Sequence, residues 1–549
     1  MHVELVLLVL SLLFFISIIA DKIGYKFGVP ALLLFLTVGM IFGSHSFPAL
    51  FGARGIEIET GSAQAISTLA MCIILFTGGM ETKLSDIKSV LVPGITLATV
   101  GVMLTCLITG IIIYFLFGWL NAVTSVSIWL ALLMAATMSS TDSASVFSIM
   151  RTNGIGLKHN LRPLLELESG ANDPMAYVLT TTLIGVVLTT DTFVGTTREV
   201  EALPIIQTIV VQLVMGTVLG LAFGEGLVHL MRRVKLGNEA LYPIMVLTAC
   251  IFIFSITYYL QGNTYLAVYV GGLIIGNNKF ARKRQTKSFF NGLTWLSQLV
   301  MFLMLGLMVN PKELLNYQVW LPCLIISIVM IFISRPAAVW LCMLPFRQYK
   351  QRDRLMMSWV GLKGAVPIIF AIMCKANGLP YADLIFNVVF LCTIVSLLAQ
   401  GTTLTVVARK LALDTPPTEE RELEHFDIDL PDEIQSSARE VEVTPQILVN
   451  GNTPREIDIP PHTLIVMVRR GEDFFIPTGS SQLEVGDQLL VISDQDAEAS
   501  FKHMTDEAEE EAIWRENMRR EWKERMDRMA ARMRKLAKKK GNTKESKEI

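Results

Sequence analysis

A chain of 549 residues that is 52% hydrophobic and only 17% charged has too little polar surface for a soluble protein of this size. Most of it should therefore lie in a lipid bilayer. The formal net charge of -2 gives no reason to expect nucleic acid as a partner. All seven cysteines fall in apolar stretches without metal-ligand spacing, so we interpret them as packing residues and expect no cofactor.

Apolar segments follow one another from the N-terminus to about residue 410. A spanning helix needs about 20 apolar residues, and this length predicts about thirteen transmembrane helices. The first lacks the basic start and the cleavage site of a signal peptide, so we expect it to be retained. The predicted spans are near residues 3–20, 29–46, 63–80, 90–118, 125–150, 161–189, 205–231, 240–260, 263–277, 288–309, 317–345, 355–375 and 382–408.

The charges of the connecting loops predict the orientation. If the C-terminus is cytoplasmic, the cytoplasmic loops hold about twenty-one lysines and arginines and the opposite loops hold about four. One missed or invented helix would reverse every later loop and destroy this pattern. We therefore expect a multi-pass protein of the cell inner (plasma) membrane with a cytoplasmic C-terminus.

The fifth predicted span is interrupted by small polar residues. The apolar run IWLALLMAA leads into residues 139–143, which read SSTDS and include Thr141 and Asp142. Hydroxyls and a carboxylate in mid-helix compete for backbone hydrogen bonds and favour local unwinding. An unwound stretch exposes carbonyl oxygens that can hold a cation. The alternative is an intact helix whose polar face packs on its neighbours.

The sixth predicted span carries the densest group of polar residues. Glu166, Ser169, Asn172 and Asp173 are spaced three or four residues apart and lie near one helix face, and Pro174 frees a backbone carbonyl one turn earlier. A carboxylate away from water can hold either a proton or a cation but should not easily hold both. This competition is the basis of antiport, and Asp173 is the expected exchanging group.

Two basic residues lie within the predicted spans. Arg335, near the middle of the eleventh span, needs a carboxylate partner, and Glu168 is the candidate for a structural ion pair. The alternative is that Arg335 extends to the cytoplasmic edge of the bilayer. Lys363 lies in GLKGAVP of the twelfth span, where it could neutralise the carbonyl ends of a broken helix or reach the interface.

The fifth and twelfth spans hold matching places if the first six and last six helices form two inverted repeats. Interrupted helices at corresponding positions of two repeats indicate the binding site of a transporter. We therefore expect these two interrupted helices to contribute to the site.

The chain changes character after the last span. The transmembrane domain is assigned to residues 1–410 and an acidic linker to 411–435. Short alternating runs at 438–443, 462–469, 473–476 and 488–493, separated by turn residues, predict a small α+β domain over 436–504. Residues 505–549 are assigned to a charged helical tail with a disordered end; the tail could form a coiled coil, lie on anionic lipid or pack on its own domain.

In its predicted spans the chain resembles the NhaP-type monovalent cation:proton antiporters, in particular the potassium/proton antiporters of cell-volume regulation. The motif ESGANDPMA (168–176), the Thr141–Asp142 pair and Arg335 carry the resemblance, which covers about residues 1–410. It implies a sodium/proton antiporter-like fold and electroneutral exchange. It also implies that Asp173, the Asp142 region, the Thr141 carbonyl and the Ser169 hydroxyl hold the cation, with Asn172 in support.

The stretch RRGEDFFIPTGSSQLEVGDQLLVI resembles the C-terminal subdomain of potassium-conductance regulators, the RCK-C or TrkA-C module. This resemblance implies a dimerising, ligand-sensing domain, and therefore a homodimer with a possible nucleotide effector.

The expected function is secondary active exchange of K+ or Na+ for H+ by alternating access, serving ion, pH and volume homeostasis, with K+ favoured by the resemblance. The alternative is an ion channel gated by the same cytosolic domain, but no TVGYG-like filter loop is found in the sequence. The spans hold no Ser/His, metal or paired-Asp catalytic set, so we expect a transporter and not an enzyme.

Overall fold

The computed structural model divides the chain into two compact units, Met1–Pro417 and Thr418–Ile549. We call them the membrane unit and the C-terminal unit. The structure describes residues 3–27, 31–44, 55–120, 126–152, 155–190, 202–234, 236–415, 438–443, 447–448, 451–457, 463–471 and 473–493. The predicted linker after residue 415 and the predicted helical tail lie outside these residues.

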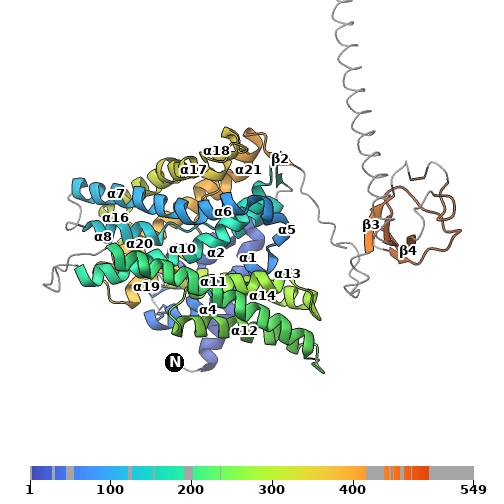
Figure 1. The fold of residues 1–549 in the computed structure, drawn as a ribbon, viewed down its shortest axis with the longest axis horizontal. Helices are drawn as coiled ribbons and strands as arrows, with labels where there is room; N and C mark the ends of the chain where they lie inside the picture. Colours follow the sequence, from blue (N-terminus) through green and yellow to red (C-terminus); the bar gives the residue numbers. More distant parts are fainter. Residues whose placement is uncertain are drawn as a thin grey trace, which may run out of the picture. The chain divides into compact units, whose positions relative to one another are not determined.

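The membrane unit consists almost entirely of helices packed side by side (Figure 1). Its first half contains α1 (Val3–Phe27), α2 (Ala31–Phe42), α4 (Thr60–Glu81), α5 (Leu84–Ile87), η1 (Lys88–Val90), α6 (Leu91–Thr96), η2 (Leu97–Gly101), α7 (Val102–Leu120), α8 (Ile128–Thr137), α9 (Ser143–Thr152) and α10 (Leu161–Thr190). The remainder contains α11 (Ala202–Arg233), α12 (Leu241–Tyr259), α13 (Thr264–Asn277), α14 (Lys283–Leu307), α15 (Pro311–Leu314), α16 (Tyr317–Val329), η4 (Met330–Ser334), α17 (Arg335–Met343), α18 (Gln351–Trp359), α19 (Val366–Ala376), α20 (Ala382–Ser396), η5 (Leu397–Gly401) and α21 (Thr402–Lys410).

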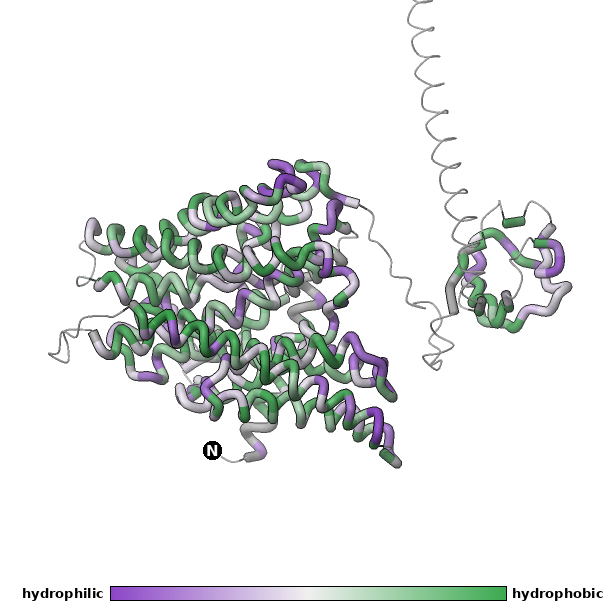
Figure 2. The backbone as a smooth tube through the Cα atoms, viewed as in Figure 1, coloured by the Kyte–Doolittle hydropathy of each residue, from purple (hydrophilic) through white to green (hydrophobic). Residues whose placement is uncertain are grey.

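The helices have the composition of membrane spans. Within the described residues, eight helical segments are long and apolar enough to cross a bilayer, and five shorter apolar helices accompany them. Figure 2 shows hydrophobic residues along most of the helix lengths. The predicted helical membrane protein is therefore confirmed. The total of thirteen spans stays a prediction, because length and composition identify only eight complete crossings.

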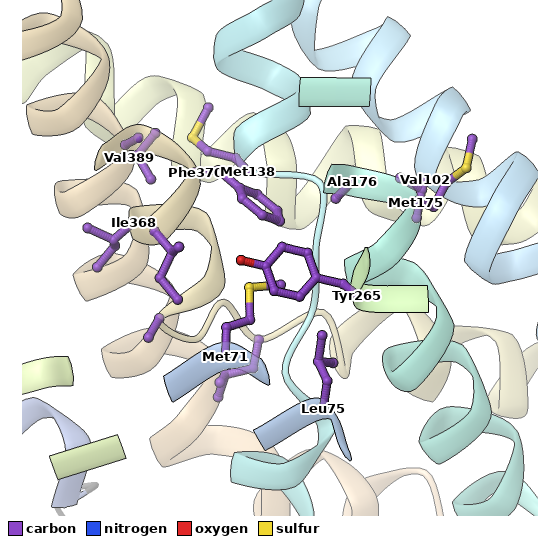
Figure 3. Packing of buried hydrophobic residues seen from close by; sticks show 14 of the residues in the cluster. Met71, Leu75, Val102, Met138, Met175, Ala176, Tyr265, Ile368, Phe370 and Val389 are labelled. Carbon is purple, nitrogen blue, oxygen red and sulfur yellow. The ribbon is translucent and has the colours of Figure 1, made fainter. Parts of the chain in front are cut away.

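Small residues allow several helices to approach closely. Gly272 and Gly276 of α13 lie directly against the backbone of Phe76 and Met80 of α4, where a side chain has no room. In lipid, where no hydrophobic force drives helices together, such contacts supply much of the packing energy. Larger apolar residues fill the adjoining space: Figure 3 shows Tyr265 of α13 in the same buried cluster as residues of α4, α10 and α19.

Gly276→Ala should destabilise the membrane unit by about 1–3 kcal/mol, because the new Cβ would lie 2.6 Å from the Cα of Met80 and force α4 and α13 apart. Unfolding of the detergent-purified protein measures this. Gly292→Ala in α14 is the matched control, because a Cβ at that position would meet no atom of a neighbouring helix within 4 Å. Equal stability of the two variants would contradict the packing argument.

Two helices are interrupted, in the fifth and twelfth predicted spans. Residues 138–142 separate α8 from α9, and residues 360–365 separate α18 from α19. The two interruptions contact each other, since the Asp142 N–H donates to the Leu362 carbonyl at 2.8 Å. The backbone groups released by the two breaks thus partly satisfy one another. The predicted unwinding at both places is confirmed, and the intact-helix alternative for the fifth span is wrong.

A two-stranded sheet joins the end of the membrane unit to the loop before α10. β1 (Gly156–Leu157) pairs antiparallel with β2 (Asp414–Thr415), and the Lys158 N–H donates to the Leu413 carbonyl at 3.0 Å. Residues 411–415, predicted to belong to the linker, are therefore part of the ordered structure. Apolar Leu413, which is buried, holds this short segment against the helices.

The C-terminal unit contains a four-stranded antiparallel sheet in the order β3-β6-β4-β5. Its strands are β3 (Ala438–Glu442), β4 (Thr463–Arg470), β5 (Asp473–Phe475) and β6 (Gln488–Ser493). Each predicted run forms a strand within one residue of the expected bounds, because alternating apolar residues face the small core around Val441, Val468 and Leu489.

Acid should weaken this unit. Burial alone would raise the pKa of Asp487, but two hydrogen bonds from Arg470, at 2.7 and 2.8 Å, and one from the Glu484 N–H lower it overall. A lowered pKa in the folded state stabilises the fold above about pH 4, the ordinary aspartate value. This contribution is lost as the pH falls through the lower folded value. Hydrogen exchange of β4 and β6 amides measures it.

The Asp487→Asn variant should lose this acid dependence, whereas Asp473→Asn, at an exposed position of β5, should keep it. An identical acid profile of the wild type and Asp487→Asn would contradict the role of the Arg470 contact.

Candidate functional site

The polar residues of α10 lie against the interruption between α8 and α9. The Ser169 Oγ donates to the Thr141 carbonyl at 2.8 Å, and the Asn172 Nδ2 donates to the Thr141 Oγ1 at 2.5 Å. The Asp173 carboxylate accepts a hydrogen bond from the Ser140 hydroxyl. All of these side chains are buried. The Ser169 hydroxyl thus satisfies a backbone carbonyl that the interrupted helix leaves without a partner, and the Asn172 amide holds the Thr141 side chain.

Asp142 lies at the start of α9 and caps it. Its carboxylate accepts hydrogen bonds from the backbone N–H of Ser145, at 3.0 Å, and from the Ser145 hydroxyl, at 2.5 Å. Gly364 of the second interruption lies against this carboxyl group, and a Cβ there would be 2.8 Å from the Asp142 Cβ. Glycine at position 364 therefore lets the two interruptions meet at Asp142.

Lys363 lies at the point where the two interruptions meet. Its ammonium donates to the Ser140 carbonyl at 2.8 Å, and its side chain is buried rather than at a membrane interface. A cation at this place offsets the partial negative charge of the carbonyls that end α8. This is the first of the two positions that the sequence left open for Lys363.

Glu168 and Arg335 face each other across α10 and α17. The Arg335 Nη1 lies 2.5 Å from the Glu168 Oε1, and the two side chains are only 5% and 1% exposed. A second nitrogen of Arg335 is 3.4 Å from the Met357 carbonyl in α18. Arg335 therefore does not extend to the bilayer edge, and it links three helices around a neutralised carboxylate.

Glu166, although one turn from the site on α10, does not join it. It forms an ion pair with Arg162 at 2.9 Å, one turn nearer the start of the helix, where both side chains are partly exposed. The helical spacing suggested a common face with Ser169 and Asp173, but Glu166 has a partner of its own outside the buried site.

Three residues that support the site were not singled out from the sequence. Ser140 contacts Asp173, as described above, and was noticed only as part of a polar run. Ser396 and Gln400 hold the second interruption: the Lys363 N–H donates to the Ser396 Oγ at 2.9 Å, and the Gln400 Nε2 donates to the Trp359 carbonyl at 2.9 Å. Their four-residue spacing in an apolar helix was the available signal.

The site offers oxygen ligands to a cation. Asn172 Oδ1 is buried and has no hydrogen-bond partner among the described residues, while the Nδ2 of the same amide donates to the Thr141 Oγ1. Carboxylate, amide and carbonyl oxygens suit hard cations. Within the described residues, no group of three His, Cys, Asp or Glu side chains could hold a metal ion.

Comparison with known proteins places this chain in a family. Residues 8–410 match the family model "Sodium/hydrogen exchanger, transmembrane", and residues 439–505 match the TrkA-C domain. The K(+)/H(+) antiporter NhaP of Alkalimonas amylolytica is 40% identical over 419 residues, which make up 75% of this chain and 68% of that protein. The K(+)/H(+) antiporter NhaP2 of Shewanella sp. (strain MR-4) is 35% identical over 503 residues, or 91% and 83% of the two chains.

A solved structure has the same fold. The sodium proton antiporter MjNhaP1 from Methanocaldococcus jannaschii aligns with a TM-score of 0.62 at 20% identity, over 75% of this chain and 99% of the other. The family model covers the membrane unit from α1 to the end of α21, including both interruptions and α10. The chain belongs to the sodium/hydrogen exchanger family and carries a TrkA-C domain after its membrane unit.

Proposed function

We propose that this protein is a secondary active antiporter that exchanges a monovalent cation for H+ at Asp173. The observation that carries the proposal is a contrast between two buried carboxylates of α10. Glu168 is committed to Arg335. Asp173 accepts from the neutral hydroxyl of Ser140 and has no ion-pair partner among the described residues. It is the carboxylate left available for an exchangeable positive charge.

A single carboxylate that binds one positive charge at a time explains why cation movement is coupled to proton movement. Asp173 with a proton and Asp173 with an alkali cation both carry no net charge, whereas empty Asp173 carries one negative charge out of water. A bare charge in a low-dielectric interior is strongly unfavourable. The loaded site should therefore change access between the two sides of the membrane more readily than the empty one, which gives electroneutral one-for-one exchange by alternating access.

Thr141, Ser169, Asn172 and Asp142 complete the proposed site. The Thr141 carbonyl and the Asn172 amide oxygen supply ligands, and Ser169 fixes the carbonyl through its hydrogen bond. Asp142 caps α9, so that its negative charge lies near the cation. Lys363 and the Glu168–Arg335 pair hold the surrounding helices in place.

K+ is the proposed cation, with Na+ as the alternative. The support is that relatives at 40% and 35% identity are K(+)/H(+) antiporters. Everted vesicles with a pH-sensitive dye should show faster proton movement on addition of K+ than on addition of Na+, Li+ or Rb+ at equal concentration. A faster response to Na+ would reassign the cation. A response that required an imposed membrane potential would favour the channel alternative over exchange.

We further propose that the protein is a homodimer of the inner membrane, that its cytoplasmic C-terminal unit regulates exchange in ion, pH and volume homeostasis, and that a nucleotide is the effector. The TrkA-C match supports a ligand-sensing role. The β1–β2 sheet provides a route, because it joins the chain leading to that unit to the loop before α10. Adenine nucleotides should shift the unfolding temperature of the full chain; the absence of any shift would argue against them.

A further inference from the structure

Ser140 contacts two buried charged residues through two different groups. Its carbonyl accepts from the Lys363 ammonium at 2.8 Å, and its hydroxyl donates to the Asp173 carboxylate. The residue is 1% exposed and lies in the interruption after α8, where its backbone makes no regular helical turn. Ser140 therefore contacts both the lysine and the aspartate, which form no ion pair with each other.

We propose that Ser140 is a positioning residue that aims the Asp173 carboxylate at the cation and keeps the Lys363 charge from occupying it. The inference rests on the proposed function of Asp173. Ser140 contacts the exchanging carboxylate of Asp173 but does not itself exchange the proton or the cation.

The chemistry of a hydroxyl suits this role better than that of an ammonium. A serine hydroxyl donates to an ionised carboxylate and can turn to accept from a protonated one, so it satisfies both states of Asp173. An ammonium only donates, and in direct contact it would hold the carboxylate as a permanent ion pair. That is the situation of Glu168 with Arg335.

Because the Ser140 carbonyl is held in place, the direction of the Ser140 hydroxyl is restricted as well. Lys363 holds the Ser140 carbonyl, and the Lys363 backbone is itself held by Ser396 at 2.9 Å. With its peptide group anchored, Ser140 has a single side-chain torsion left to direct its oxygen. The Asp173 carboxylate is thus held in one orientation before the cation arrives, which lowers the entropy lost on binding.

Ser140→Ala should raise the half-saturating K+ concentration of exchange about tenfold while the maximal rate stays within about twofold, as loss of a hydrogen bond to a charged group implies. Ser140→Thr keeps the hydroxyl and should restore wild-type half-saturation. Ser140→Cys keeps the volume with a much weaker donor, so it should resemble alanine and preserves the test should the alanine variant assemble poorly. Everted vesicles with a K+ series measure all three.

Ser139→Ala is the matched control. Ser139 is buried in the same interruption, but its hydroxyl donates to the Ala136 carbonyl at 2.7 Å and not to Asp173. The control should leave half-saturation unchanged. If Ser140→Ala and Ser139→Ala shift it equally, or if Ser140→Thr fails to restore it, Ser140 is a structural residue and the inference is overturned. Wild-type exchange by Asp173→Asn would instead overturn the proposed function itself.

Discussion

Replacement of Asp173 by asparagine should reduce cation/proton exchange at least 100-fold. The substitution keeps the size of the side chain and an oxygen that can accept from Ser140. It removes the group that binds a proton, and it removes the negative charge that offsets a cation in a buried place. Because both steps of the cycle need this group, the loss should appear in the maximal rate and no K+ concentration should overcome it. Dye dequenching in everted vesicles measures the rate.

The control for this substitution is Asp383→Asn at the start of α20. Asp383 forms an ion pair with Lys375 at 2.7 Å, and its side chain is 73% exposed. Removing that charge should leave the exchange rate unchanged. Equal expression and equal unfolding temperatures of the two variants would show that the loss at Asp173 concerns transport. Full-rate exchange by Asp173→Asn would mean that another group carries the proton.

The interruptions and the buried ion pair could be predicted from the sequence because each rests on a strong local rule. The polar residues of SSTDS after the apolar run IWLALLMAA favour a break in the helix, and so do the two glycines and the proline around Lys363. A lone arginine in a span requires a carboxylate, and α10 offered few. The strands of the C-terminal unit could be predicted in the same way, from alternating apolar residues and the turn residues between them.

What sequence could not provide is which group of the interruption after α8 meets which group of α10. Once a helix is broken, the directions of its side chains no longer follow a period, so the pairing of Ser140 with Asp173 and of Thr141 with Asn172 depends on the folded backbone. The role of Gly364 is equally invisible, because it consists of space left for Asp142. Span counting also has a physical limit, since half-helices such as α8 and α19 are too short to cross alone.

Arg335→Ala should destabilise the membrane unit by about 3–5 kcal/mol, the usual effect of leaving one member of a buried ion pair without its partner. The remaining Glu168 carboxylate is 1% exposed and cannot reach water. The link from Arg335 to the Met357 carbonyl of α18 is lost as well. Glu168→Ala should have a similar effect, because it leaves the guanidinium uncompensated. Thermal unfolding of the detergent-purified protein measures both.

A double variant distinguishes a charge effect from a packing effect. Glu168→Gln combined with Arg335→Met removes both charges while keeping most of the side-chain volume, so it should recover at least half of the stability lost in either alanine variant. It should also retain exchange, because Asp173 is untouched. Unchanged stability in both alanine variants would refute the structural ion pair. If the double variant were stable but had lost exchange, Glu168 would take part in the transport cycle and not only support the helices.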